Sequence, residues 1–252
     1  SLIKPIIAIP TTAGTGSEVG RAGVFLNEET HKKKIIFHPK MLPQIAILDP
    51  SLTINLPKGI TAGTGMDALA HCIEAYSSPF YHPMAEGTAV EGLRLVKENI
   101  QEVYHNGTNI EARAHMLVAS MMGAAAFQKG LGAIHSITHP VNSLYHTHHG
   151  TTNGTVMPFV LNFNREMIEK KFDRLAKFLN IPNGFEGIVN WVIDLKKEME
   201  IPETLKDMGV NIGDEVKLAP LAQEDPSTGG NPLEMDENKF KKLIGNCIEG
   251  KY

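Results

Sequence analysis

The run Gly63-Thr64-Gly65-Met66-Asp67-Ala68-Leu69-Ala70-His71-Cys72-Ile73-Glu74-Ala75-Tyr76 is rich in helix-forming residues and opens on a glycine-rich turn. It predicts a helix over residues 65–77, in which Asp67 and His71 share one face because they stand four positions apart. Asp67 is then expected in the first helical turn, where the helix dipole favours a negative group. The pair fits two ligands of one cation, and fits equally a helix-start acid followed by a buried histidine.

Helical patterns continue on the C-terminal side of this run. Residues 110–128, rich in Ala and Met, predict a helix that is buried on most sides at the centre of a bundle. The other expected helices cover residues 84–105, 130–145, 155–164, 166–179, 188–199, 203–208, 214–221 and 237–248, and a polar loop covers residues 223–234.

The first fifty residues follow a different pattern. Four short β-rich runs, bounded by Gly, Pro, Asn, Asp or charged residues, predict strands at 6–9, 22–26, 34–37 and 44–48. No helical pattern separates them, so they lack the covering layer that a self-sufficient α/β domain needs. We therefore predict a mainly α fold in two parts, with a few β-strands over residues 1–50 and a helical bundle over residues 51–252.

The composition is that of an ordinary globular protein, with 252 residues, 42% of them hydrophobic, and a formal net charge of −4. No long block of Lys and Arg indicates a nucleic-acid partner, and no run approaches the roughly 20 apolar residues of a membrane span. Cys72 and Cys247 are far apart and outside CxxC spacing, so they do not indicate a disulfide framework. These features, together with the lack of a signal-peptide pattern, favour a cytoplasmic protein.

Histidines gather in one short stretch. Five of the eleven fall between residues 135 and 149, namely His135, His139, His146, His148 and His149. Such a cluster indicates metal binding or proton handling, although loop histidines that bind nothing are common. His135 and His139 repeat the four-residue spacing, and spacing alone does not say which of them binds a metal. One carboxylate with three imidazoles suits Fe(II), Zn(II), Co(II) or Ni(II), and with an open position such a site is a Lewis acid.

The first expected strand runs into Pro10-Thr11-Thr12-Ala13-Gly14-Thr15-Gly16-Ser17-Glu18. A strand followed by a loop rich in Gly and Thr offers backbone N–H groups and hydroxyls to a phosphate or a ribose. The loop does not match GxGxxG and no clear helix follows it, so by itself it is a weak signal of nucleotide binding.

Taken together, these motifs resemble the iron-containing (group III) alcohol dehydrogenase family. The resemblance rests on the run 9–18, on Asp49-Pro50, on the run 63–76, on Gly132-Ala133-Ile134-His135-Ser136-Ile137-Thr138-His139-Pro140, on His149-Gly150 and on Met157-Pro158. These motifs occur in the order and at the separations of the family. They cover nearly the whole chain, and the two long ones are highly specific.

The resemblance implies a divalent metal, Fe(II) or alternatively Zn(II). The implied ligands are Asp67, His71, His135 and His149. It also implies that residues from about 51 onward form the family's helical C-terminal domain, which is dehydroquinate synthase-like. The strands of residues 1–50 are then the last strands of an α/β dinucleotide-binding domain.

The same resemblance implies an activity and its further residues. His139 matches the histidine that lies beside the nicotinamide and takes part in proton relay. Thr11, Thr12 and Thr15 match the loop that contacts NAD or NADP near its nicotinamide end. The implied reaction is hydride transfer between a small alcohol or aldehyde and the nicotinamide, in an enzyme that is a homodimer.

The chain departs from the family pattern at three points. The Gly-Gly-Gly-Ser pyrophosphate loop does not occur, so we expect a fragment with an incomplete cofactor site and weak cofactor binding. His148 stands where the family has a proline, which leaves His148 as an alternative metal ligand. Val19-Gly20-Arg21, after the Gly-rich loop, departs from the usual threonine.

Two other interpretations belong to different functional classes. A non-redox, metal-binding helical module would explain the histidines but not the Thr-Thr-Ala-Gly-Thr-Gly-Ser-Glu loop. A metal-free relative, such as a maleylacetate reductase or an inactive paralogue, would not need four ligands. The dehydrogenase accounts for both the loop and the ligand set.

Overall fold

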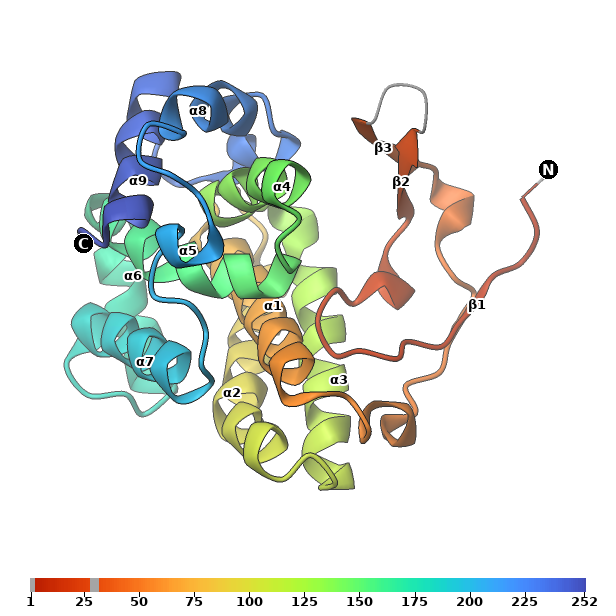
Figure 1. Ribbon diagram of the computed structural model, residues 1–252. Coiled ribbons are helices and arrows are strands. Elements are labelled where there is room, and N and C mark those ends of the chain that lie inside the picture. Colours follow the sequence, from red (N-terminus) through yellow and green to blue (C-terminus); the bar gives the residue numbers. More distant parts are fainter. Residues whose placement is uncertain (1–2, 28–31) are drawn as a thin grey trace.

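The computed structural model describes residues 3–27 and 32–252, and most of these residues are helical (Figure 1). A helical body holds residues from 58 onward, and the strands lie beside it as a separate layer. This arrangement confirms the mainly α fold. The helices are α1 Lys58–Ser77, α2 Pro83–His105, α3 Ile110–Ala126, α4 Ala133–Tyr145, α5 His149–Phe163, α6 Arg165–Phe178, α7 Gly184–Glu198, α8 Glu215–Gln223 and α9 Glu237–Glu249.

Helix α1 is the centre of the body. It packs against α2, α3 and α5, and from Thr61 to Ser77 every residue except Thr64 is buried. Helix α3 is buried along much of its length, as its composition predicts, and ends two residues early in the 3₁₀ turn Phe127–Lys129. The most enclosed position in the body therefore belongs to the helix that carries Asp67 and His71.

The starts of α1 and α5 differ most from the sequence prediction. Helix α1 begins at Lys58, so Asp67 lies in its third turn, and the expectation that the helix dipole stabilises this acid is wrong. Helix α5 begins at His149 rather than at residue 155, because the run Gly150-Thr151-Thr152-Asn153-Gly154 is a poor helix former that packing against α1 makes helical. His149 is therefore the first residue of a helix and not part of a loop.

A glycine explains how closely α1 and α5 approach. A Cβ atom built on Gly150 would lie 1.9 Å from the carbonyl oxygen of Gly63, which is a backbone atom that cannot turn away. Only glycine therefore fits at this crossing. Gly150 therefore lets α1 and α5 cross in close contact.

The strands form two small sheets. β1 Ile7–Ala8 pairs in parallel with β4 Ile45–Ala46, and β2 Ala22–Asn27 pairs antiparallel with β3 Lys32–Phe37. All four expected strands are present, the first and last being shorter than predicted. Ile7 and Ile45 are 60% and 52% exposed, so the described residues supply no complete cover for this parallel pair.

Smaller differences occur in the loops. The helix expected over 203–208 is only the 3₁₀ turn Lys206–Met208, and the polar loop after α8 contains a second one, Pro226–Gly230. The Gly-rich loop leads into a third, Ser17–Val19. Within the described residues no single helix has the length and apolarity of a membrane span, and only the pair Ile110–Lys129 and Ala133–Tyr145, bent by 107°, passes that test jointly.

Candidate metal centre

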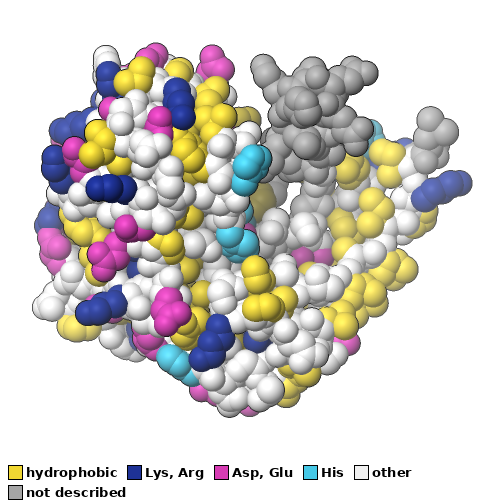
Figure 2. Space-filling model, in the orientation of Figure 1, with side chains coloured by type: hydrophobic (Ala, Val, Ile, Leu, Met, Phe, Trp, Pro, Cys, Tyr) yellow, Lys and Arg dark blue, Asp and Glu magenta, His cyan; other side chains and the backbone are white. Residues whose placement is uncertain are grey.

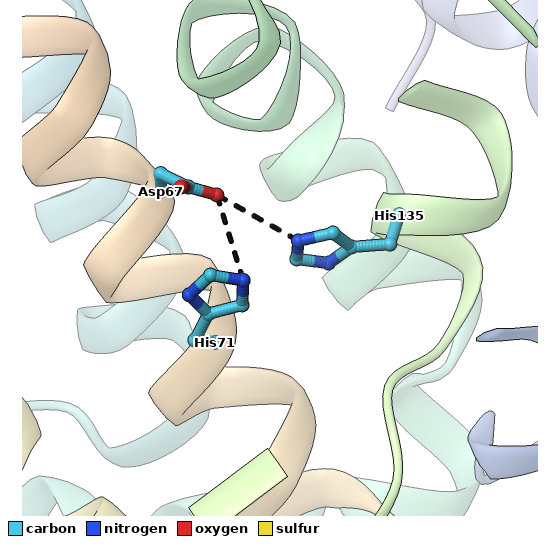
Figure 3. A group of neighbouring side chains, drawn as sticks. All are labelled: Asp67, His71 and His135. Atoms are coloured by element: carbon cyan, nitrogen blue, oxygen red, sulfur yellow. Dashed lines mark ion pairs between the residues drawn. The ribbon is translucent and has the colours of Figure 1, made fainter. Parts of the chain in front are cut away.

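Four side chains from three helices meet around one carboxylate oxygen. His71 Nε2 and His135 Nε2 each lie 3.7 Å from Asp67 Oδ1, and His149 Nε2 lies 3.4 Å from the same oxygen. The ligand atoms of Asp67, His71 and His135 all lie within 4.8 Å of one another (Figure 3). The structure therefore brings together all four residues that the family resemblance implies, Asp67 and His71 from α1, His135 from α4 and His149 from α5.

The distances fit a bound cation better than direct hydrogen bonds. Ligand bonds of about 2.1 Å in a tetrahedral site place neighbouring ligand atoms about 3.4 Å apart. The distances of 3.4 to 3.7 Å from the three Nε2 atoms to Asp67 Oδ1 match that separation and exceed the usual length of a hydrogen bond. A carboxylate with three imidazoles also has the mixed N/O chemistry that Fe(II) and Zn(II) accept. The residues present fit a divalent transition metal.

Burial and mutual charge set the protonation of the four groups. Burial lowers the pKa of His71 to about 4 and also lowers the pKa of His149. It acts in the same direction on His135, but Glu74 and then Asp67 outweigh it and raise the pKa of His135 to about 9. For Asp67, burial is outweighed by the facing imidazoles, His71 first, which hold its pKa well below its usual range. Asp67 therefore stays ionised among the three imidazoles, as a ligand of a cation must.

Two polar residues orient the histidine rings from behind. His135 Nδ1 donates to Glu74 Oε2 at 2.6 Å, and His149 Nδ1 donates to Asn142 Oδ1 at 2.9 Å. Each bond places the Nδ1 proton away from the cluster and leaves Nε2 to face Asp67, which is the arrangement common around metal-binding histidines. Sequence analysis did not assign Glu74 or Asn142. Glu74 stands three residues after His71, a spacing that could have indicated it.

The start of α4 is held by groups from distant parts of the chain. Glu74 Oε1 accepts from the N–H of Ile134 at 2.7 Å, and Asn231 Oδ1 accepts from the N–H of Ala133 at 3.2 Å. These bonds satisfy two of the amides that a helix start leaves unpaired. A Cβ atom on Gly132 would lie 2.9 Å from Asn231 Oδ1, so the glycine leaves room for this arrangement. The capped start fixes His135 one residue further along.

His139 lies beside the cluster and outside it. Its ring stacks on that of His149 with centroids 5.5 Å apart, and its side chain is 39% exposed. Its Nδ1 donates to Asp225 Oδ2 at 2.8 Å. Burial would raise the pKa of Asp225, but this contact with His139 outweighs it and the pKa is lowered. Asp225, in the polar loop, was not assigned from the sequence because 86 residues separate it from its partner.

The extra histidine His148 has a different place. Its Nδ1 accepts from the N–H of Thr151 at 3.3 Å, so it caps the start of α5 and is exposed. Within the described residues it forms no ion pair with Asp67, and His149 occupies the position that faces the carboxylate. The geometry therefore favours His149 over His148 as a ligand. Histidine side chains lie along the border of the helical body that faces the N-terminal segment (Figure 2).

The Gly-rich loop passes close to the same helix. A Cβ atom on Gly14 would lie 2.9 Å from Thr64 Cβ. Burial lowers the pKa of His71, and a hydrogen bond with the Gly14 backbone acts in the opposite direction. Thr11 and Thr15 are exposed and Thr12 is half-buried, so their hydroxyls are available to a ligand. The loop is thus held against α1, with Thr11 and Thr15 exposed and Thr12 partly exposed.

Comparisons with known proteins agree with this geometry. The model of the iron-containing alcohol dehydrogenase family, C-terminal, matches residues 61–248, and that of iron-containing alcohol dehydrogenase matches residues 2–50. A 4-hydroxybutyrate dehydrogenase from Cupriavidus necator is 39% identical over 250 residues, which are 95% of this chain and 65% of the relative. The chain thus spans slightly less than two thirds of that relative's length.

Solved structures give the same result. A 1,3-propanediol oxidoreductase matches with a TM-score of 0.93 and 34% identity, over 97% of this chain and 66% of that one. A sulfoacetaldehyde reductase from Bifidobacterium kashiwanohense, in complex with NAD+, matches with a TM-score of 0.90 and 28% identity, over 96% and 64% of the two chains. With family models matching most of its length, and with the fold and the ligand set in agreement, this chain belongs to the iron-containing alcohol dehydrogenase family.

Proposed function

We propose that this chain forms the metal-binding, substrate-activating part of an NAD(P)-dependent alcohol dehydrogenase. The observation that carries the proposal is the convergence of three imidazole Nε2 atoms on Asp67 Oδ1 at 3.4 to 3.7 Å. The proposed metal is Fe(II) or Zn(II), held by Asp67, His71, His135 and His149. The proposed substrates are small alcohols with a terminal hydroxyl, since relatives named for 4-hydroxybutyrate and 1,3-propanediol match 95% and 96% of this chain at 39% and 33% identity.

The chemistry divides between the bound groups and the side chains. When bound, a divalent metal supplies Lewis acidity toward an alcohol or carbonyl oxygen, and NAD(P) supplies the hydride acceptor or donor. Asp67 and the three histidines hold the cation, while Glu74 and Asn142 keep two of the rings turned toward it. The enclosed position of α1 limits water on the side of His71 and His135, which are 5% and 2% exposed.

His139 is proposed to carry the proton. It is the half-exposed histidine whose ring stacks on His149, so it joins the cluster to solvent. Asp225 accepts from its Nδ1 and thereby directs Nε2 away from that carboxylate. The loop with Thr11, Thr12 and Thr15 is proposed to contact the nicotinamide end of the cofactor, because it lies against α1 with exposed hydroxyls.

Metal analysis of purified variants tests the ligand set. We expect the protein to hold close to one divalent metal per chain when prepared without air, and His71→Ala and His149→Ala to lose it. His148→Ala is the matched control, because it removes a neighbouring imidazole that caps α5. Full metal content in His149→Ala, or its loss in His148→Ala alone, would overturn the ligand assignment.

A further inference from the structure

Asn153 is an amide side chain that contacts three of the four residues of the ligand cluster. It lies one turn after His149 on α5 and is completely buried. Its Nδ2 lies 2.8 Å from Asp67 Oδ1 and 3.3 Å from both His135 Nε2 and His149 Nε2. It therefore touches three of the four ligand atoms and sits over the face that they form, with His71 at the remaining corner.

The hydrogen-bond roles follow from the neighbours. The carboxylate of Asp67 accepts one N–H of the amide. His149 presents Nε2 as an acceptor, because its Nδ1 donates to Asn142 Oδ1. Asn142 is itself oriented by its Nδ2, which donates to Thr147. The two N–H groups of Asn153 thus match two acceptors, Asp67 Oδ1 and His149 Nε2, and hold them toward each other.

The carbonyl oxygen of the same amide supports this orientation. Asn153 Oδ1 is buried and has no hydrogen-bond partner among the described residues. A buried acceptor without a partner is unfavourable, so the contacts of the N–H groups must outweigh it. Turning the amide over would place Oδ1 against Asp67 Oδ1, and two acceptors would then face each other where one is charged. The ligand cluster itself therefore fixes which way the amide points.

We propose that Asn153 is a positioning residue of the metal centre, which keeps Asp67 Oδ1 and His149 Nε2 in place for the cation and directs a single oxygen of Asp67 to it. This inference rests on the proposed function, because it requires that the four ligands bind a metal. A cation held by His149 Nε2 would take up the lone pair of that atom, and the bond from Asn153 to Asp67 would remain. The amide thus acts on the metal through Asp67.

Zinc affinity tests the role of Asn153. We expect Asn153→Ala to bind Zn(II) about 10- to 100-fold more weakly than the parent, the range found when groups behind metal ligands are removed. The measurement is competition with a chromophoric chelator at fixed pH. Thr155→Val is the matched control, because it removes a buried hydroxyl from the same helix, whose partners are the carbonyl oxygens of Thr151 and Pro202. The control should bind zinc within twofold of the parent.

The outcomes separate this inference from the proposed function. If the parent itself holds neither Zn(II) nor Fe(II) supplied without air, the proposed function fails. If the parent binds and Asn153→Ala binds within twofold of it, or more tightly, the positioning role is wrong while the ligand set stands.

A second measurement covers a variant that does not fold. In the unmutated protein, zinc should shift the side-chain amide resonances of Asn153 in an ¹H–¹⁵N NMR spectrum, since one of their two acceptors is withdrawn. Resonances that do not respond to stoichiometric zinc would overturn the inference.

Discussion

Replacing Glu74 by glutamine gives the sharpest test of how the metal centre is held. The change keeps the shape of the side chain and removes its charge. The amide oxygen can still accept from the N–H of Ile134, but the amide nitrogen then faces His135 Nδ1, which is also a donor. To avoid two facing donors, the neutral form of the His135 ring, which is the form that binds a metal, must carry its proton on Nε2, the atom that faces Asp67. The ring would then present a proton where a metal needs a lone pair.

The size of the effect follows from the lost contact. The bond from His135 Nδ1 to Glu74 Oε2 is 2.6 Å long, and the two side chains are 2% and 5% exposed, so solvent screens it little. A hydrogen bond to a charged group contributes about 1.5 to 3 kcal/mol. To bind a metal, the Glu74→Gln protein must place the proton of His135 on Nδ1 without the help of this bond. We therefore expect zinc affinity to fall by about 10- to 100-fold, in line with similar substitutions behind metal ligands.

Chelator competition with Zn(II) measures this directly, and Glu86→Gln serves as the control. Glu86 also loses ion pairs, with Lys129 at 2.9 Å and Lys171 at 2.7 Å, but it contacts none of the ligands. Its zinc affinity should equal that of the parent. The reasoning is refuted if Glu74→Gln binds zinc within threefold of the parent, or if Glu86→Gln is weakened as much. A Glu74→Gln protein that is less stable but binds zinc normally would make the carboxylate a purely structural group.

Three further predictions concern stability. Zinc at about 100 times its dissociation constant should stabilise the protein by about 2.7 kcal/mol and raise its melting temperature by about 5–10 °C in calorimetry; an equal shift in His71→Ala would count against the site. The Gly150→Ala protein should lose about 3 kcal/mol or more of unfolding free energy in urea, since the added Cβ would lie 1.9 Å from the Gly63 carbonyl oxygen. The control Gly245→Ala, which has open space around it in α9, should gain about 0.5 to 1 kcal/mol of unfolding free energy. Burial lowers the pKa of Lys196 to about 8, below the value of about 10.4 in an unfolded chain, so the unfolded chain binds more protons between these values. Relative to Lys196→Met, the unfolding free energy should therefore rise by about 1–3 kcal/mol as pH increases from 8 to 10.4, and identical pH profiles would contradict the assignment.

Much of the fold follows from local pattern. The expected spans of α2, α6 and α9 differ from the structure by one residue at most at each end, because an apolar stripe with a polar opposite face leaves little choice of conformation. The start of α5 was not predictable in this way. Gly150 and Gly154 disfavour a helix by propensity, and only contact with α1 outweighs that preference.

The polar groups around the ligands also differ in whether the sequence alone could have predicted their contacts. Glu74 belongs to the helix of Asp67 and His71, so its proximity follows from the helical repeat. Asn153 stands one turn from His149, but this neighbourhood depends on the start of α5, which contact with α1 establishes. Asp225 was not, because its contact with His139 joins segments 86 residues apart and depends on how the polar loop folds over α4.

The sequence by itself determined the ligand chemistry and the pairing of Asp67 with His71, because two residues four positions apart on a helix must lie about one turn apart on one face. Spacing left open which histidine of α4 faces Asp67, since His135 and His139 satisfy it equally, and the family resemblance implied His135. The tertiary structure places His135 toward Asp67 and His139 toward Asp225. The physical reason is that the rotation of α4 about its axis is set by contacts from outside the helix, chiefly Glu74 and Asn231 at its first amides.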